Sequence, residues 1–128
     1  MKLRIKGNSI RLRVMRSELE RLQAGQRLEE SVQFAPTIDG VLRYSLALDA
    51  STSVPISVSF RSHEIATLIS REQLDGWSVE AQVGLYATLP ITANTSLEVA
   101  IEKDFACLDS NDADNADTFA NPLTGATC

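Results

Sequence analysis

The chain has 128 residues, of which 44% are hydrophobic and 23% charged, and its formal net charge is −5. These values are typical of one soluble globular domain and exclude a wholly disordered chain. The apolar runs are only a few residues long, whereas a membrane-spanning helix needs about 20 apolar residues. Charges also interrupt the N-terminus, where a signal peptide would be apolar, so we expect a cytoplasmic protein that does not bind a membrane.

The two ends of the chain carry opposite charge. Residues 1–16 contain six basic side chains and no acid, whereas residues 101–128 contain one lysine and six acids. This asymmetry is typical of a nucleic-acid site with an acidic tail, or of two ends that lie on each other in the fold.

The first predicted element is a β-hairpin. Residues 2–6 and 10–14 alternate basic and aliphatic side chains, which is the period of two of a half-buried strand. Gly7 and Asn8, between the two segments, tolerate the positive φ of a tight hairpin turn.

A short helix follows the hairpin. Ser17 to Glu20 has the form of a capping box, in which the serine hydroxyl accepts from a backbone amide and the glutamate reaches back. Leu19 and Leu22 lie three positions apart on one face, and Gly25 suits a left-handed cap. The pattern predicts about two helical turns.

Alternating hydrophobicity and turn residues predict five further strands, at residues 27–34, 41–48, 54–60, 79–87 and 96–103. In the last of these, Glu98 and Glu102 are expected to face outward. Between the third and fourth of these strands, the spacing of the apolar residues after Ser62 predicts a second helix that ends at Gly76. Ser62 is then its N-cap and His63 lies in its first turn.

These elements predict an α+β fold: a twisted, mostly antiparallel sheet or partial barrel of about seven strands with two short helices. We expect one domain over residues 1–108, and an acidic tail over residues 109–128 that is extended or partly disordered. An internal β-α-β repeat is an alternative to a fold without one, because residues 10–17 and 56–62 both alternate and both reach Arg-Ser before a predicted helix.

One group of motifs lies within residues 4–34: the run Lys6-Gly7-Asn8-Ser9, the pair Arg13-Val14, Leu19, Leu22, Gly25 and the strand that follows. It resembles the looped-hinge-helix domains of AbrB-like and MazE-like transcriptional regulators. In that family two chains interleave their hairpins and the basic arms bind DNA. The resemblance therefore implies a homodimer and phosphate contacts by Lys6, Arg11 and Arg13. Two positions depart from the family: Met15 stands where proline is usual, and Lys6 where an aromatic residue is common.

The whole chain, especially its start KLRIKGNSIRLR and its end IEKDFACL, also resembles a family of small bacterial proteins of uncharacterised function. This resemblance implies no activity.

The basic hairpin has two interpretations. Like charges on paired strands lie about 5 Å apart and cost stability unless acids or a polyanion lie beside them. Either Glu98 and Glu102 of the last strand neutralise Arg4 or Lys6, or the hairpin contacts the phosphates of DNA.

A metal site is a separate hypothesis. The candidate ligands are two thiols, two carboxylates and the single imidazole: Cys107, Cys128, Asp109, Asp112 and His63. The cysteines lack the Cys-x-x-Cys spacing of a zinc site, and the acids lack the glycine and final glutamate of a calcium loop. Thiols in the cytoplasm stay reduced, so a disulfide between the cysteines would require another compartment.

The sequence predicts no enzyme and no cofactor. It has one histidine and neither a glycine-rich phosphate loop nor a metalloprotease motif. We therefore expect a binding or regulatory module whose partner is DNA or another protein. The alternatives are a metal- or thiol-dependent module, and a structural protein-protein interaction domain whose acidic tail is the ligand.

Overall fold

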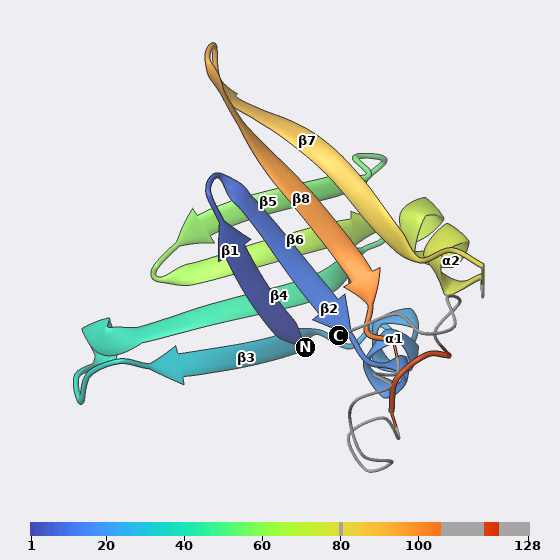
Figure 1. Cartoon of the computed structure of the whole chain (residues 1–128), viewed down its shortest axis with the longest axis horizontal. Coiled ribbons are helices and arrows are strands. Elements are labelled where there is room, and N and C mark those ends of the chain that lie inside the picture. The colour runs from blue at the N-terminus through green and yellow to red at the C-terminus, as the bar shows by residue number, and fades with distance from the viewer. Residues whose placement is uncertain (80, 106–116, 121–128) are drawn as a thin grey trace.

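The computed structural model of the chain describes residues 1–79, 81–105 and 117–120 (Figure 1). Within these residues, eight strands form two four-stranded sheets. Sheet A contains, in spatial order, β1 (Lys2–Lys6), β2 (Ser9–Val14), β8 (Thr95–Lys103) and β7 (Gly84–Thr92). Sheet B contains β3 (Leu28–Gln33), β4 (Val41–Asp49), β6 (Glu64–Ser70) and β5 (Ile56–Arg61). A 3-10 turn at Ile38–Gly40 precedes β4.

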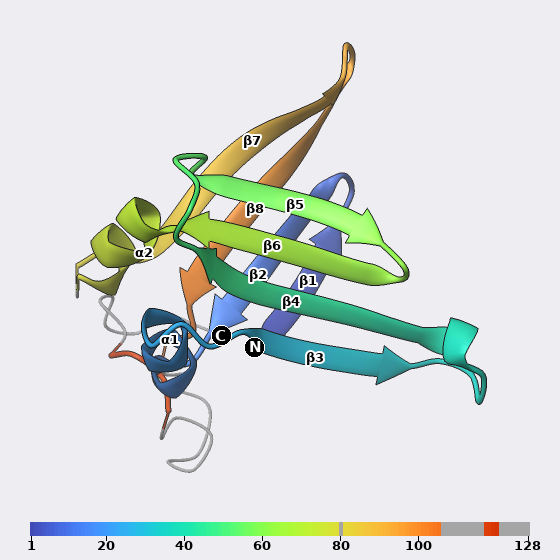
Figure 2. The ribbon, with the colours of Figure 1, turned by 180° about the vertical axis from the view of Figure 1, so that it is seen from behind.

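The two sheets are stacked, and their strands cross at a steep angle (Figures 1 and 2). The helices α1 (Arg16–Gln23) and α2 (Arg71–Ser78) lie together at one end of the molecule, beside both sheets. The predicted α+β fold with two short helices is confirmed. The described strands number eight, one more than predicted, and they divide between two sheets because hairpins from both halves of the chain meet in each.

The fold contains an internal structural repeat that differs from the β-α-β repeat considered from the sequence. Each half has the order hairpin, helix, hairpin: β1-β2-α1-β3-β4 and β5-β6-α2-β7-β8. Each half contributes one hairpin to each sheet, so the halves interleave. The two central strands of each sheet, β2 and β8 in sheet A and β4 and β6 in sheet B, come from different halves and pair in parallel. The registers of the two parallel pairs agree, because Ile10 pairs with Val99 and Tyr44 with Ile65, and a shift of 55 positions converts one pair into the other.

The sequence alignment that equated residues 10–17 with 56–62 is therefore wrong, since residue 10 corresponds to residue 65. The second predicted helix is also partly wrong, because residues 64–70 form β6. This central strand carries apolar side chains on both faces, so it lacks the period of two that marks a half-buried strand.

The turn before β6 differs from the prediction as well. Ser62 and His63 form the β5-β6 hairpin turn with φ of 51° and 62°, not a helix start. Helix α2 begins at Arg71, and the Ser70 side chain accepts a hydrogen bond of 3.3 Å from the Gln73 amide. The following strand, β7, begins at Gly84 and not at residue 79, and it runs beyond residue 87 to Thr92.

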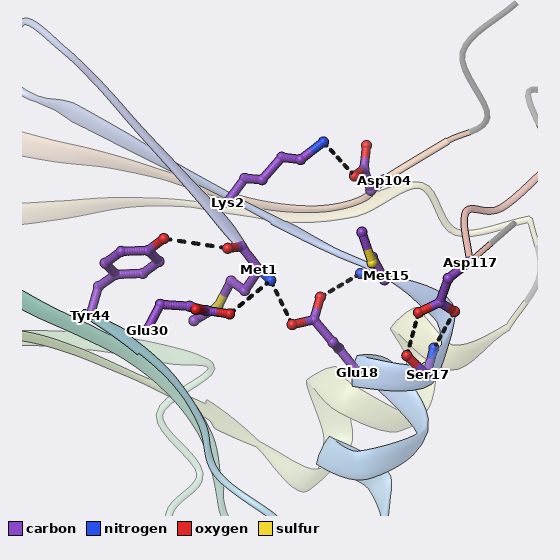
Figure 3. A network of polar contacts seen from close by, with 9 residues as sticks. All are labelled: Met1, Lys2, Met15, Ser17, Glu18, Glu30, Tyr44, Asp104 and Asp117. Carbon is purple, nitrogen blue, oxygen red and sulfur yellow. Dashed lines mark hydrogen bonds and ion pairs between the residues drawn. The ribbon is translucent and has the colours of Figure 1, made fainter. Parts of the chain in front are cut away.

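Helix α1 begins one residue before the predicted capping box. Its N-cap is Met15, whose amide donates to Glu18 at 2.9 Å. Ser17 donates its hydroxyl to the Asp117 carboxylate, and its amide to the same group at 3.0 Å (Figure 3). The predicted pair of Ser17 and Glu20 is therefore wrong, because a carboxylate from the far end of the chain caps the helix.

Glu18 also links α1 to Met1, the residue before β1. Its second carboxylate oxygen lies 2.5 Å from the amino group of Met1, which is also 3.5 Å from Glu30 on β3 (Figure 3). The Tyr44 hydroxyl donates to the Met1 carbonyl at 3.4 Å. These polar contacts hold the first strand against sheet B and the helix.

The core lies between the sheets and the two helices. Each sheet and helix supplies fully buried aliphatic or aromatic side chains, among them Leu12, Val14, Leu22, Leu46, Ile69, Leu74, Trp77 and Ile101. The Trp77 indole, at the position equivalent to Leu22, donates to the Val83 carbonyl at 3.2 Å, which satisfies its only polar atom.

Thr67 is a polar exception in this core. It corresponds to Leu12 in the repeat, is 1% exposed, and its hydroxyl has no hydrogen-bond partner among the described residues. Because Thr67→Val keeps the volume and removes a desolvated hydroxyl, we expect it to raise the free energy of unfolding by about 1 kcal/mol. The reciprocal change Leu12→Thr should lower it by roughly 2 kcal/mol or more. Urea denaturation measures both, and a destabilised Thr67→Val variant would contradict this account of the core.

Candidate functional site

The outer face of sheet A, turned away from sheet B, gathers the basic side chains of the N-terminal hairpin. Strand alternation and register place five cations on this face: Lys2, Arg4, Lys6, Arg11 and Arg13. We call these five side chains the basic face. The three residues predicted to contact phosphate, Lys6, Arg11 and Arg13, thus share one surface, and Arg4 lies directly opposite Arg11.

Strand β8 partly neutralises the basic face. The Glu102 carboxylate lies 3.1 Å from Arg11 Nε and 3.9 Å from Arg13 Nε. Lys2 Nζ is 3.1 Å from Asp104. The prediction that outward acids of the last strand lie beside the hairpin is confirmed, but their partners differ from those expected. Among the described residues, Arg4 and Lys6 have no carboxylate within 4.0 Å.

An open groove crosses this face of the sheet. Its volume is about 380 Å³, and the residues that line it include Arg4, Lys6, Ser9, Arg11, Tyr86, Glu98 and Ala100. The register places Arg11, Ala100 and Tyr86 side by side on β2, β8 and β7. Because Ala100 is small, it leaves the floor of the groove low between the arginine and the tyrosine.

Glu102 connects the two sides of the groove. Besides its ion pair with Arg11, it accepts a hydrogen bond of 2.7 Å from the Tyr86 hydroxyl. Burial and the hydrogen bond and charge of Glu102 raise the pKa of Tyr86 to about 12, against the opposing effect of Arg11. The phenol is therefore a protonated hydrogen-bond donor at neutral pH.

Gly84 makes room for the Tyr86 ring. A Cβ at this position would lie 2.8 Å from the Ile101 carbonyl and 3.0 Å from the Tyr86 hydroxyl. Glycine thus allows β7 to approach β8 with the tyrosine laid beside Glu102. Although its hydroxyl is held, Tyr86 remains 62% exposed.

The outer face of sheet B has the same strand arrangement as sheet A but a different pattern of charged side chains. Ala66 and Leu68 occupy the positions equivalent to Arg11 and Arg13. Two arginines of this face are paired: Arg27 lies 2.5 Å from Glu64, and Arg43 lies 3.7 Å from the same carboxylate. Excess positive charge is therefore a property of sheet A and not of the repeat.

The candidate metal ligands are not brought together in the described part of the chain. Residues 1–79, 81–105 and 117–120 contain no group of three or more histidine, cysteine or acidic side chains that could hold a metal ion. His63 lies in the β5-β6 turn, and four other candidates, Cys107, Cys128, Asp109 and Asp112, lie outside the described residues. The metal site formed by these residues stays a prediction. The domain boundary at residue 108 and the extended or partly disordered tail over most of residues 109–128 also stay predictions.

Sequence reasoning missed Tyr86 as a site residue. The outward alternation of Tyr86 and Thr88 is the signal that could have identified it, but the strand was placed several residues too early. No helix in the described residues is long and apolar enough to cross a membrane.

The pKa of Tyr86 can be tested by titration. We expect near-ultraviolet absorbance to show one tyrosine with a pKa near 12, absent in Tyr86→Phe. Replacing Glu102 with glutamine should move this pKa toward the ordinary value of 10, because the charge that opposes ionisation is removed. Because the pKa of Tyr86 is raised on folding, this contact makes its full contribution to the free energy of unfolding below pH 10. That contribution is lost as the pH rises toward 12. An ordinary pKa in the native protein would contradict the contact with Glu102.

Comparison with known proteins identifies the family of the chain but no activity. No curated protein and no solved structure gives a significant match. The resemblance of residues 4–34 to AbrB-like and MazE-like domains stays a prediction. A family of unknown function matches residues 1–123, nearly the whole chain, and the chain therefore belongs to this family, DUF7009.

Proposed function

We propose that the chain is a non-enzymatic binding module that holds a nucleic acid through the basic face of sheet A. The observation that carries this proposal is the pair Arg4 and Lys6, which line an open groove without a carboxylate within 4.0 Å among the described residues. Among the residues that the structure describes, five cations on this face meet three acids, Glu98, Glu102 and Asp104, which leaves an excess of positive charge.

A polyanion would relieve a local cost of the fold. Arg4 and Arg11 are direct cross-strand neighbours, and like charges at this spacing repel each other. A phosphate placed between them would replace repulsion with two attractive contacts and would release counterions. Because the chain as a whole is acidic, we expect binding to be confined to this face and to weaken steeply with salt.

The chemistry of this face suits binding better than catalysis. Its functional groups are cations, a phenol that stays protonated at neutral pH, and carboxylates already engaged with arginine, lysine, tyrosine or threonine. The only histidine of the chain, His63, lies in a turn of the other sheet. The resemblance of residues 4–34 to DNA-binding hairpins indicates the same surface.

A structural protein-protein interaction domain is the second candidate. The β3-β4 hairpin extends away from the helices (Figure 1), and near its tip Phe34 is 73% exposed and Ile38 84% exposed. Exposed apolar side chains that gather at one place are typical of contact surfaces. If this tip is the contact, replacing both residues with serine should abolish concentration-dependent association in analytical ultracentrifugation, and Arg4→Ala/Lys6→Ala should not affect it.

The first candidate predicts a salt-dependent affinity that depends on two side chains. We expect Arg4→Ala/Lys6→Ala to weaken binding of a random-sequence fluorescent oligonucleotide. It should also reduce the slope of log affinity against log salt by roughly 1.5, since each lost phosphate contact removes about 0.7 to 0.9. Fluorescence anisotropy over a series of salt concentrations measures both quantities.

The matched control is Arg61→Ala/Arg71→Ala, which removes the same charge from sheet B and α2. It should leave the slope close to that of the native protein. Equal effects of the two double variants would show that only net charge matters, and would contradict a site on sheet A.

A further inference from the structure

We infer that the nucleic acid bound by sheet A is single-stranded, with Tyr86 as the surface on which a base stacks and Arg4 and Arg11 as the phosphate contacts. This inference rests on the proposed function, and it adds the class of nucleic acid and the orientation in which it lies. Three features of the described residues support it: the width of the sheet, the exposed aromatic ring and the direction of the charge gradient.

The width of sheet A argues against contact between this face and the bases of a duplex. A free two-stranded ribbon can enter the major groove of DNA, which is about 12 Å wide. In this fold β2 pairs with β8 from Ser9 to Val14, so the pairing begins beside the hairpin turn and the basic hairpin has no free ribbon. Four strands at about 4.8 Å spacing span roughly 14 Å between the outer backbones alone. The face can therefore touch only the phosphates of a duplex, whereas a single strand can present its bases to it.

Tyr86 provides the stacking surface. Tyr86 is 62% exposed, and its hydroxyl donates to Glu102 at 2.7 Å, which limits the positions that the ring can take. Bases of any sequence stack on aromatic rings of this kind in single-strand binding proteins. A ring held in place before binding loses little conformational entropy when a base is added.

The small side chain of Ala100 leaves room for a nucleotide between Tyr86, where its base would lie, and Arg11, where its phosphate would lie. Arg11 and Tyr86 are two strands apart, about 10 Å between backbones, with Ala100 between them. A base that lies over Ala100 against the tyrosine ring has its phosphate on the side of Arg11 and Arg4. One nucleotide thus spans the groove from β7 to β1.

The charge gradient across the sheet sets this orientation. Glu98 lines the groove on β8 and accepts a hydrogen bond of 2.8 Å from Thr88 on β7, so negative charge is fixed on the side of the tyrosine. Phosphates are repelled from this side and attracted to β1 and β2. The uncharged faces of the bases are the part of a single strand that can occupy the region beside β7.

The test compares one sequence in two forms. A labelled single strand of about 20 nucleotides and its duplex are titrated with the native protein by fluorescence anisotropy at the same salt concentration. We expect the single strand to bind about tenfold more tightly than the duplex. Tyr86→Ala should weaken single-strand binding by about 5- to 50-fold, within the range of stacking effects, while Tyr86→Phe, which keeps the ring but loses its contact with Glu102, should weaken it less.

Two controls separate stacking from folding and from charge. Phe60→Ala removes an aromatic side chain of similar exposure, 65%, from sheet B and should have no effect on binding. Heparin carries negative charge without bases, so its affinity should fall in Arg4→Ala/Lys6→Ala and remain unchanged in Tyr86→Ala. Circular dichroism establishes that each variant is folded.

The outcomes separate the inference from the proposal that it rests on. Duplex binding as tight as single-strand binding, or equal losses for both forms in Tyr86→Ala, would overturn the inference and leave the binding proposal standing. No binding of either form by the folded native protein would overturn both.

Discussion

The parallel pairing of β2 with β8 is the constraint on which the rest of the structure depends. It joins residues 9–14 to residues 98–103, so neither sheet can be completed by one half of the chain. The parallel pair β4-β6 imposes the same requirement on sheet B. Each helix carries the chain from a hairpin in one sheet to a hairpin in the other, and the core forms where these crossings meet. The candidate site inherits this dependence, because Arg4 and Arg11 come from the first half and Tyr86 and Glu102 from the second.

Comparison of equivalent positions in the two halves shows which side chains are constrained by packing in the core and which are free to differ on the surface. Core positions of the two halves carry side chains of similar character, such as Leu22 and Trp77 or Leu46 and Ile101, because close packing between the sheets limits what fits. The outward positions carry no such restriction, and there Arg11 corresponds to Ala66 and Arg13 to Leu68. The same strand arrangement therefore presents a basic face on sheet A and a nearly neutral face on sheet B.

The sequence could predict those parts of the molecule whose physical cause is local. Strict alternation with Gly7-Asn8 identified the first hairpin and the shared face of Lys6, Arg11 and Arg13, and it also placed Glu102 outward on the last strand. The rest depends on contacts between distant residues. Strand β6 carries apolar side chains on both faces and so resembles a helix segment in its hydrophobic pattern. The cap of α1 comes from Asp117, a hundred positions away, and no local motif signals it. The pairing of Arg11 with Glu102 required the register of a parallel pair, which alternation alone cannot supply.

The most direct test of the account is to map the binding surface by nuclear magnetic resonance, with a labelled sample of the native protein and an unlabelled single-stranded oligonucleotide. If sheet A is the site, the amide shifts that change will cluster on β1, β2, β8 and β7, with Arg4, Arg11, Ala100 and Tyr86 among the largest. The outward residues of sheet B, including Ser59 and Ala66 at the equivalent positions of the repeat, will stay unchanged. Changes confined to sheet B or to the tip of the β3-β4 hairpin would contradict the central claim that the charge difference between the two sheets marks the functional surface.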